Sequence, residues 1–509
     1  MRRPRRILAL CAALVALALA GCGGGDDDAP GPLDEALSYL PEKAPFAVAI
    51  DTDLEGDQVE AVDSLLGKFP LGVDSVEGAL EEELAGGEQN VDFEKDVKPL
   101  LGNPFVVGAT NVASFTDDTE DDDFVAATQV KDTDALDALI DKTGPTEQGE
   151  ESGATVYEDD GTLFAVKDDM VIFAGSERLL TTALERAGGD EHLDADTFEQ
   201  GLDGLPGSAL ARVYADIGAI IASDPDTRDA RKVPWVSALE TLGLTASAAD
   251  DGVEMQFNLR TNGEDLSDAD LPIAAGDESP GVIERDGEIG FGIRDLAQVV
   301  SFGEAAAQAV DPGGFGEYEQ AKKTLEDQLG VSVDDDLFGQ FSGDLSATVA
   351  VDGQLGVRSK LRDPAAFEET LSKLADVLPS FAEGAGFGTV ALKRPSGGND
   401  FYALAQADGD AVVFGVIDGS FVLANDAARA GQLVAEQPAS VPDAQGAVTM
   451  RADAQALAGA LLEQLGPALG LGGVEAFGAR LFTGPLEDLT GSVQSSTDGL
   501  RGRISLAIH

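Results

Sequence analysis

The densest group of residues that could do chemistry in this sequence is a run of carboxylates. The stretch DDTEDDD holds six acids: Asp117, Asp118, Glu120, Asp121, Asp122 and Asp123. Carboxylate oxygens suit calcium, but a selective site needs ligands at fixed loop positions and a glycine at the sharp turn. The run has no glycine and lies between two strand-like segments, so we interpret it as an acidic hairpin loop that binds divalent ions weakly at most. The shorter run Asp224–Asp229 (DPDTRD) is a second weak calcium candidate, for which we also expect no more than weak, unselective binding of divalent ions.

Residues for nucleophilic or acid–base catalysis are scarce. The chain has two histidines, of which His192 lies in the polar stretch GGDEHLD and His509 is the last residue, so a hydrolytic triad lacks a placed base. Gly384–Thr389 (GAGFGT) begins like a dinucleotide fingerprint but ends in threonine where the last glycine belongs. Paired acids that cleave glycosides need aromatic side chains to stack on sugars, and only 6% of residues are aromatic. We expect no enzyme and no cofactor.

Length, composition and charge describe a large, acidic, folded chain. The 509 residues are 43% hydrophobic, which is enough to bury more than one core. The net charge of −61 repels nucleic acid and anionic membranes, so neither is an expected direct partner of the folded part. The two cysteines are Cys11 and Cys22, and Cys11 lies in an N-terminal apolar run, so a mature chain without that run has no internal disulfide.

The N-terminus has the pattern of an export signal. Four arginines precede the apolar run Ile7–Ala20, which is shorter than the ~20 residues that a membrane-spanning helix needs. The run ends in Leu-Ala-Gly-Cys, which resembles the lipobox of bacterial lipoproteins. This resemblance implies cleavage between Gly21 and Cys22 and a lipid with acyl chains such as palmitate on the Cys22 sulfur, at the extracytoplasmic face of the cell membrane. An ordinary export signal followed by an unmodified cysteine is the alternative.

Two pairs of segments suggest that the folded part contains one pattern twice. VKDTDALDALIDK (Val130–Lys142) and LRDPAAFEETLSK (Leu361–Lys373) each predict a strand end, an aspartate N-cap and a helix. LFAVKDDMVIFAGSERLL (Leu163–Leu180) aligns without gaps to VFGVIDGSFVLANDAARA (Val413–Ala430), and both predict a hairpin followed by a helix. The same order of elements in both places favours an internal duplication.

Two further pairs extend the pattern. Ala209–Ile221 and Ala447–Gly459 each predict a strand that leads into a helix. The copies close with hairpins at Leu244–Leu259 and Leu489–Leu506, and the second strand of each alternates apolar with polar residues. These alternating residues are Met255, Phe257 and Leu259 in the first copy and Ile504, Leu506 and Ile508 in the second.

The predicted fold class is α+β, with an internally duplicated module of mainly antiparallel sheet and helices packed on one face. The predicted parts are a lipoprotein signal peptide at residues 1–21, a flexible Gly/Asp tether at 22–33, repeat 1 at 34–262, a linker at 263–283 and repeat 2 at 284–509. Trp235 lies at helical spacing from Val236, Leu239 and Leu242, which predicts a helix with Trp235 in the core.

The folded region starts with the stretch Ala36–Pro70, in which Tyr39-Leu40-Pro41 is followed by an apolar strand. This stretch resembles the opening of a bacterial family known only as domain of unknown function 3352. The resemblance implies an extracytoplasmic protein without assigned chemistry, and it offers no functional residues to carry over.

These observations favour a non-enzymatic, lipid-anchored binding protein at the cell envelope. Its partners are then the membrane, through lipidated Cys22, and an unidentified envelope protein or small ligand, without nucleic acid. One alternative is a carrier or sensor of hydrophobic molecules that uses a cavity between sheet and helices. A hydrolase that uses acidic residues is the third and least favoured possibility.

Overall fold

The computed structural model describes residues 31–70, 75–85, 91–112, 124–159, 161–223, 227–379, 390–395, 401–406, 411–465 and 482–509. The chain divides into two compact units. Unit 1 contains the described residues up to Arg228, together with Leu239–Thr261 and Ile508–His509. Unit 2 contains Asp229–Ala238 and Asn262–Ala507.

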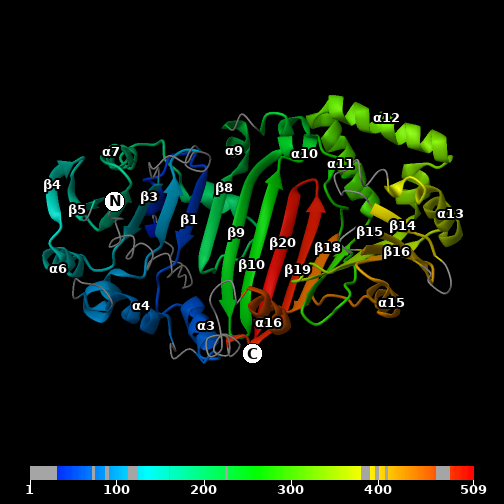
Figure 1. Cartoon of the computed structure of the whole chain (residues 1–509). Helices are drawn as coiled ribbons and strands as arrows, with labels where there is room; N and C mark the ends of the chain where they lie inside the picture. The colour runs from blue at the N-terminus through cyan, green and yellow to red at the C-terminus, as the bar shows by residue number, and fades with distance from the viewer. Residues whose placement is uncertain are drawn as a thin grey trace. The chain divides into compact units, whose positions relative to one another are not determined.

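Unit 1 is built on an antiparallel sheet (Figure 1). Its strands are β1 Phe46–Ile50, β2 Phe105–Ala109, β3 Phe124–Gln129, β4 Thr146–Glu151, β5 Ala154–Asp159, β6 Thr162–Lys167, β7 Met170–Ala174, β8 Ala211–Asp216, β9 Leu239–Ala249 and β10 Gly252–Thr261. The pairings give the order β4-β5-β6-β7-β3-β2-β1-β8-β9-β10. Neighbours along the chain are often neighbours in the sheet, as tight hairpins require.

The helices of unit 1 lie on both faces of this sheet. They are α2 Pro32–Leu37, α3 Asp57–Leu66, α4 Val76–Ala85, α6 Thr133–Thr143, α7 Glu177–Arg186, α8 Ala195–Gly201 and α9 Ile217–Ser223, with short helical turns at Phe93–Val97 and Lys98–Leu100. Leu37 of α2, Leu180 of α7 and Phe198 of α8 join one buried core with the alternate residues of the central strands. On the opposite face, α6 covers the outer strands, where Leu136 packs with Phe164.

Unit 2 has an antiparallel sheet with the same strand order as unit 1. Its strands are β11 Glu288–Ile293, β12 Phe341–Ala350, β13 Leu355–Leu361, β14 Val390–Lys393, β15 Tyr402–Gln406, β16 Ala411–Ile417, β17 Ser420–Ala424, β18 Val448–Asp453, β19 Leu486–Ser496 and β20 Gly499–Ile508. The order is β14-β15-β16-β17-β13-β12-β11-β18-β19-β20. Each strand of unit 2 therefore has a counterpart at the same place in unit 1.

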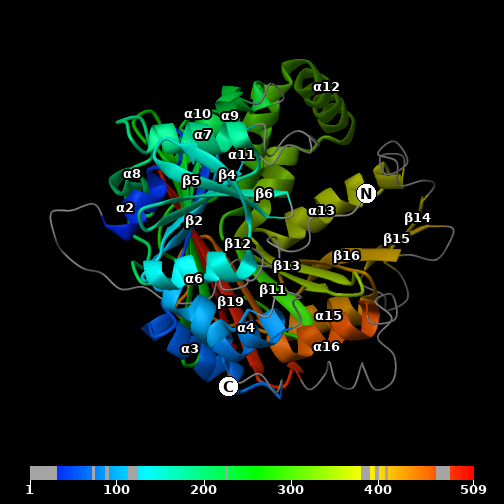
Figure 2. The same ribbon diagram turned by 90° about the vertical axis from the view of Figure 1, so that its left-hand side faces the viewer.

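Helices also pack on the sheet of unit 2. They are α10 Pro234–Ser237, α11 Leu296–Val310, α12 Pro312–Leu329, α13 Pro364–Leu374, α15 Ala427–Ala435 and α16 Ala454–Leu465, with short turns at Ala230–Lys232, Asp268–Asp270, Val333–Leu337 and Phe338–Gln340. Leu433 of α15 packs with Val422, whereas Phe367 of α13 packs with Phe414. Figure 2 shows α13 and α15 on opposite sides of β13 and β16.

The paired segments of the sequence form the elements that were predicted for them. Asp132 and Asp363 accept hydrogen bonds from backbone N–H groups in the first turns of α6 and α13. The hairpins β6–β7 and β16–β17 turn through Asp168 (φ 53°) and Asp418 (φ 48°), which both adopt the left-handed conformation that aspartate tolerates. The α+β class and the mainly antiparallel sheets are confirmed.

The predicted helix around Trp235 is wrong beyond its first turn. Helix α10 ends at Ser237, and β9 begins at Leu239, because Leu239 and Leu242 pair with β10. Trp235 itself is buried as predicted, and its ring meets Phe302 of α11 edge to face, with centroids 6.4 Å apart.

The range 263–283, predicted as a linker, packs within unit 2. Leu271, Val282 and Ile283 are fully buried, and Val282 pairs with Ala439 in an isolated bridge. The segment lies close against β11, because Gly290 has no side chain to hold the Ile283 carbonyl away.

Candidate functional site

The register of unit 1 collects apolar side chains on the sheet face opposite the core of α2, α7 and α8. Leu244 lies between Val213 of β8 and Phe257 of β10, and Val213 in turn pairs with Val48 of β1. We call this set the open apolar face; it consists of Phe46, Val48, Val107, Ala126, Val213, Leu242, Leu244, Ala246, Val253, Met255, Phe257 and Leu259. Each of these side chains is at least partly exposed, and Met255 reaches 46%.

Charge is absent from the centre of this face. Every position of the face on β9 from Leu242 to Ala248, and on β10 from Val253 to Leu259, is apolar. This contrasts with a chain in which 25% of residues are charged. An antiparallel sheet with one face on a core normally alternates to a polar second face. On β9 and β10 the side that does not join the core of α2, α7 and α8 is the apolar one, so it has the character of a binding surface.

The opposite side of β10 is the polar one, although it faces the helices. Asn258 is 3% exposed, and its Nδ2 donates to the Asp203 carbonyl just after α8, at 2.9 Å. The alternation of Met255, Phe257 and Leu259 predicts one apolar face of a strand, and the structure confirms it. The structure places this face away from α2, α7 and α8 and leaves most of it partly exposed, whereas its end at Ala248 is buried beside Gln58 of α3.

Unit 2 has a matching apolar face at the corresponding strands. Phe291 of β11 pairs with Ala347 of β12 and with Met450 of β18, and Ala347 pairs with Val357 of β13. These four side chains are partly exposed, and Val349, two residues along β12 from Ala347, is 38% exposed. The same kind of surface thus occurs once in each unit.

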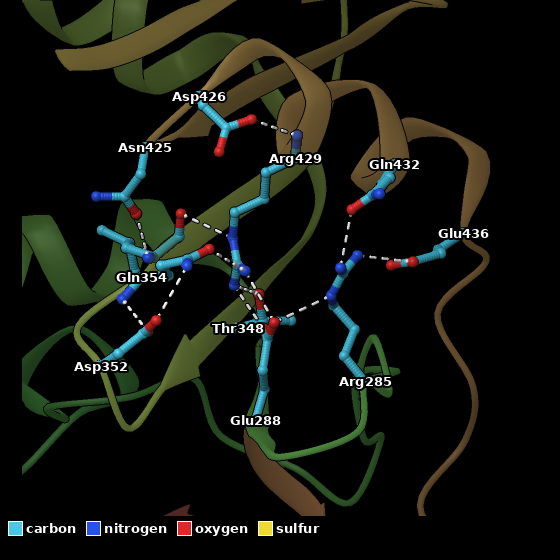
Figure 3. A network of polar contacts seen from close by, with 11 residues as sticks. Arg285, Glu288, Thr348, Asp352, Gln354, Asn425, Asp426, Arg429, Gln432 and Glu436 are labelled. Carbon is cyan, nitrogen blue, oxygen red and sulfur yellow. Dashed lines mark hydrogen bonds and ion pairs between the residues drawn. The ribbon is translucent and has the colours of Figure 1, made fainter. Parts of the chain in front are cut away.

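The strongest polar feature of unit 2 is a buried ion pair under α15 (Figure 3). The guanidinium of Arg429 donates to both carboxylate oxygens of Glu288 on β11, at 2.8 and 2.5 Å, and to Thr348 Oγ1 on β12 at 2.8 Å. Its Nε donates to the Leu355 carbonyl at 3.1 Å, and a remaining N–H reaches Gln354 Oε1 at 3.4 Å. All five donors of the guanidinium have acceptors, so the group is a brace between helix and sheet and has no donor left for a ligand.

A second arginine extends this network to the end of α15. Arg285 donates to Glu288, to Gln432 and to Glu436, at 3.1, 2.8 and 2.8 Å. Burial raises the pKa of Glu288, but hydrogen bonds from Arg429 and Thr348 and the charges of the two arginines outweigh it. The pKa of Glu288 therefore lies below the usual value for glutamate, and the carboxylate stays ionised.

Several predicted site residues lie outside the part of the chain that the structure describes. They are Gly21 and Cys22, the acidic run Asp117, Asp118, Glu120, Asp121, Asp122 and Asp123, the first half of Asp224–Asp229, and Gly384–Thr389. Of the second acidic run, Asp229 forms an ion pair with Lys232 at 2.7 Å. This pair lies at the surface and is ordinary for an exposed helical turn.

The two histidines have ordinary surroundings. His192 Nδ1 lies 3.0 Å from the Gly189 carbonyl in a partly exposed loop, and His509 is exposed. Within the described residues, no three His, Cys, Asp or Glu side chains gather closely enough to hold a metal ion. No helix in the same part of the chain combines the length and the hydropathy needed to cross a bilayer.

Comparison with known proteins places the chain in a family. Residues 7–381 match the family described as "Protein of unknown function (DUF3352)", which is more than half of the chain, and the protein belongs to this family. No curated protein matches it.

Among solved structures, crystal forms III and I of TP0453 match with TM-scores of 0.27 and 0.26 at 12% and 13% identity. These matches cover 46% and 47% of this chain and 82% and 83% of the other.

Proposed function

We propose that this protein is a non-enzymatic binding protein for hydrophobic ligands, held at the extracytoplasmic face of the cell membrane by a lipid on Cys22. The observation that carries the proposal is the open apolar face of unit 1, whose side chains are uncharged and partly exposed. A face of this kind exposes hydrocarbon to water, and covering it with a ligand is favourable by about 25 cal/mol per Å² of apolar area.

The open apolar face suits this role better than a cavity under the helices. The layer between the sheet and α2, α7 and α8 is filled by side chains with almost no exposure, such as Leu37, Leu180 and Phe198. Close packing of this sort leaves little room for a guest. The proposed ligand therefore lies on the other side of the sheet, where Met255 is exposed and its neighbours are partly exposed.

The N-terminal sequence supports the proposed location. A diacylated Cys22 supplies two chains, which are enough to anchor a protein stably at a membrane. The tether of residues 22–33 carries glycines and three consecutive aspartates, which keep it hydrated. The folded units then stand near a source of hydrophobic molecules without inserting into it.

Binding of Nile red, an uncharged apolar dye, tests the proposed function. We use the full chain with Cys22→Ala, which avoids detergent, and compare it with the same chain carrying Met255→Glu. Met255 is 46% exposed, so the new carboxylate stays hydrated in the free protein and is desolvated only under a ligand. We expect saturable dye binding, weakened about tenfold by Met255→Glu.

The matched control is Thr182→Glu, which adds the same charge on an exposed position of α7, on the other side of the sheet. It should leave dye affinity unchanged. Absence of saturable binding, or an equal loss in both variants, would refute a ligand site on the open apolar face.

A further inference from the structure

We infer that the open apolar face of unit 1 takes the hydrocarbon chains of a lipid whose head group carries no net negative charge. This inference rests on the proposed function and narrows the ligand from any hydrophobic molecule to one class. Three features of the face support it: its dimensions, its lack of hydrogen-bonding groups, and the acids at one end.

The dimensions suit extended chains. The face runs along β10 from Val253 to Leu259, and at ~3.4 Å per residue this is about 20 Å. Across the strands the open width is set mainly by β10, β9 and β8, because Ile50 of β1 and Phe105 of β2, on the same side of the sheet, are buried; a strand spacing of ~4.8 Å gives about 10 Å. A long acyl chain in extended form matches the first dimension, and the width accepts more than one chain side by side.

The chemistry of the face suits a ligand that needs no hydrogen bonds. Side chains such as Leu244 and Phe257 offer none, and strands β8 and β9 each have a strand on both sides, so their backbone groups are used within the sheet. A protein partner brings peptide groups and polar side chains that need partners, typically about one hydrogen bond per 100–200 Å² of interface. Methylene chains have no hydrogen-bonding groups to satisfy, so the chemistry of this face favours a lipid over a protein as its ligand.

The charge near the face excludes anionic head groups. Strand β1 ends at Ile50, and the register places this end beside the turn between β9 and β10. Asp53 follows β1, and the turn contributes Asp250 and Asp251, both exposed. Lys68 Nζ donates to the Asp250 carbonyl at 2.6 Å, so one ammonium group stands against three carboxylates. With a chain charge of −61, this end of the sheet therefore still repels phosphate without a compensating amine. A zwitterionic or uncharged head group meets no such penalty.

Two fluorescent lipids that differ only in the head group test the inference. Phosphatidylcholine and phosphatidylglycerol, each with one pyrene-labelled acyl chain, are titrated with the full chain carrying Cys22→Ala. We expect phosphatidylcholine to bind about tenfold more tightly than phosphatidylglycerol at low salt, with the gap narrowing as salt is added. Met255→Glu should weaken phosphatidylcholine binding about tenfold, and Thr182→Glu should not change it.

Neutralising the acids at this end of the sheet tests the assignment of the head group. Replacement of both Asp250 and Asp251 by Asn should strengthen phosphatidylglycerol binding severalfold and leave phosphatidylcholine binding unchanged. Equal affinity for the two lipids would overturn the assignment of head group. Nile red binding that Met255→Glu weakens, together with no binding of either lipid, would overturn the lipid inference while leaving the proposed function intact. Loss of all three ligands would defeat both.

Discussion

Arg429 and Glu288 form a two-bond ion pair inside unit 2, with N–O distances of 2.8 and 2.5 Å, between α15 and the first residue of β11. Leu179 occupies the position of Arg429 in the gap-free alignment of Leu163–Leu180 with Val413–Ala430, and it is buried in the core of unit 1. In each unit a helix packs on the sheet at this position. The contact is made by an apolar side chain on α7 in unit 1 and by a charged pair under α15 in unit 2.

Removal of one partner of this pair should destabilise the protein strongly. Arg429→Ala leaves the Glu288 carboxylate buried without its main donor, and we expect a loss of about 3–5 kcal/mol in the free energy of unfolding. The double variant Arg429→Met with Glu288→Leu removes both charges and should recover most of the loss. Urea unfolding followed by circular dichroism measures both effects.

An exposed ion pair serves as the control for this experiment. Arg394→Ala removes a surface pair with Asp376 and should cost no more than about 1 kcal/mol. A cost for Arg429→Ala as small as that for Arg394→Ala would contradict the bracing role of the buried pair.

The same pair predicts a dependence of stability on pH. The pKa of Glu288 is lowered in the folded protein, so the unfolded chain binds a proton more readily than the folded one. The contribution of Glu288 is therefore fully present above the unfolded value of ~4.3 and is lost as the pH falls from there through the lower folded pKa. Unfolding free energy measured over this window should fall less steeply in Glu288→Gln than in the natural protein. Parallel curves for the two proteins would count against the prediction.

Gly290 of β11 should be needed for residues 281–283 to pack closely over this strand. A methyl group on residue 290 would lie 2.4 Å from the Ile283 carbonyl oxygen, which is too close without a shift of the backbone. Gly290→Ala should therefore cost about 1–3 kcal/mol, as overpacking in a core does. Thermal unfolding checks this, with Gly316→Ala as a matched change.

Gly316 lies in α12 with no atom near its missing side chain. The change to alanine there should stabilise the helix by about 0.5–1 kcal/mol. If both glycine variants shift the unfolding temperature in the same direction, the close approach of residues 281–283 to β11 is not what constrains residue 290.

Local sequence signals predicted most of the helix starts and hairpin turns. Asp132 and Asp363 begin helices as N-caps, and Asp168 and Asp418 mark hairpin turns, because these features depend on a few adjacent residues. The error at Leu239 has the opposite origin. Leu239 has helical spacing from Trp235, but it lies in β9 because β9 pairs with β10. The spacing of apolar residues within one short segment does not reveal such a pairing.

The candidate site was harder to predict than the framework. The alternation at Met255 and Phe257 predicts one apolar face for a strand but does not say which layer covers it. The ion pair joins residues 141 positions apart, and in sequence Glu288 and Arg429 look like ordinary surface charges. The sequence offers one signal, which is Arg429 itself: the residue of α7 that aligns with it in unit 1 is Leu179.

The membrane anchor can be tested independently of the folded units. Cys22 is the proposed lipidated residue, whereas Cys11 lies in the apolar run that the proposed cleavage after Gly21 would remove. Cys22→Ala should release the protein from membranes or leave its precursor uncut, because a thioether to the lipid cannot form. Cys11→Ala, a change of the same size eleven positions earlier, should leave both anchoring and processing intact. Membrane fractionation with metabolic labelling by palmitate separates the two, and normal processing with retained label in Cys22→Ala would show that the anchor lies elsewhere.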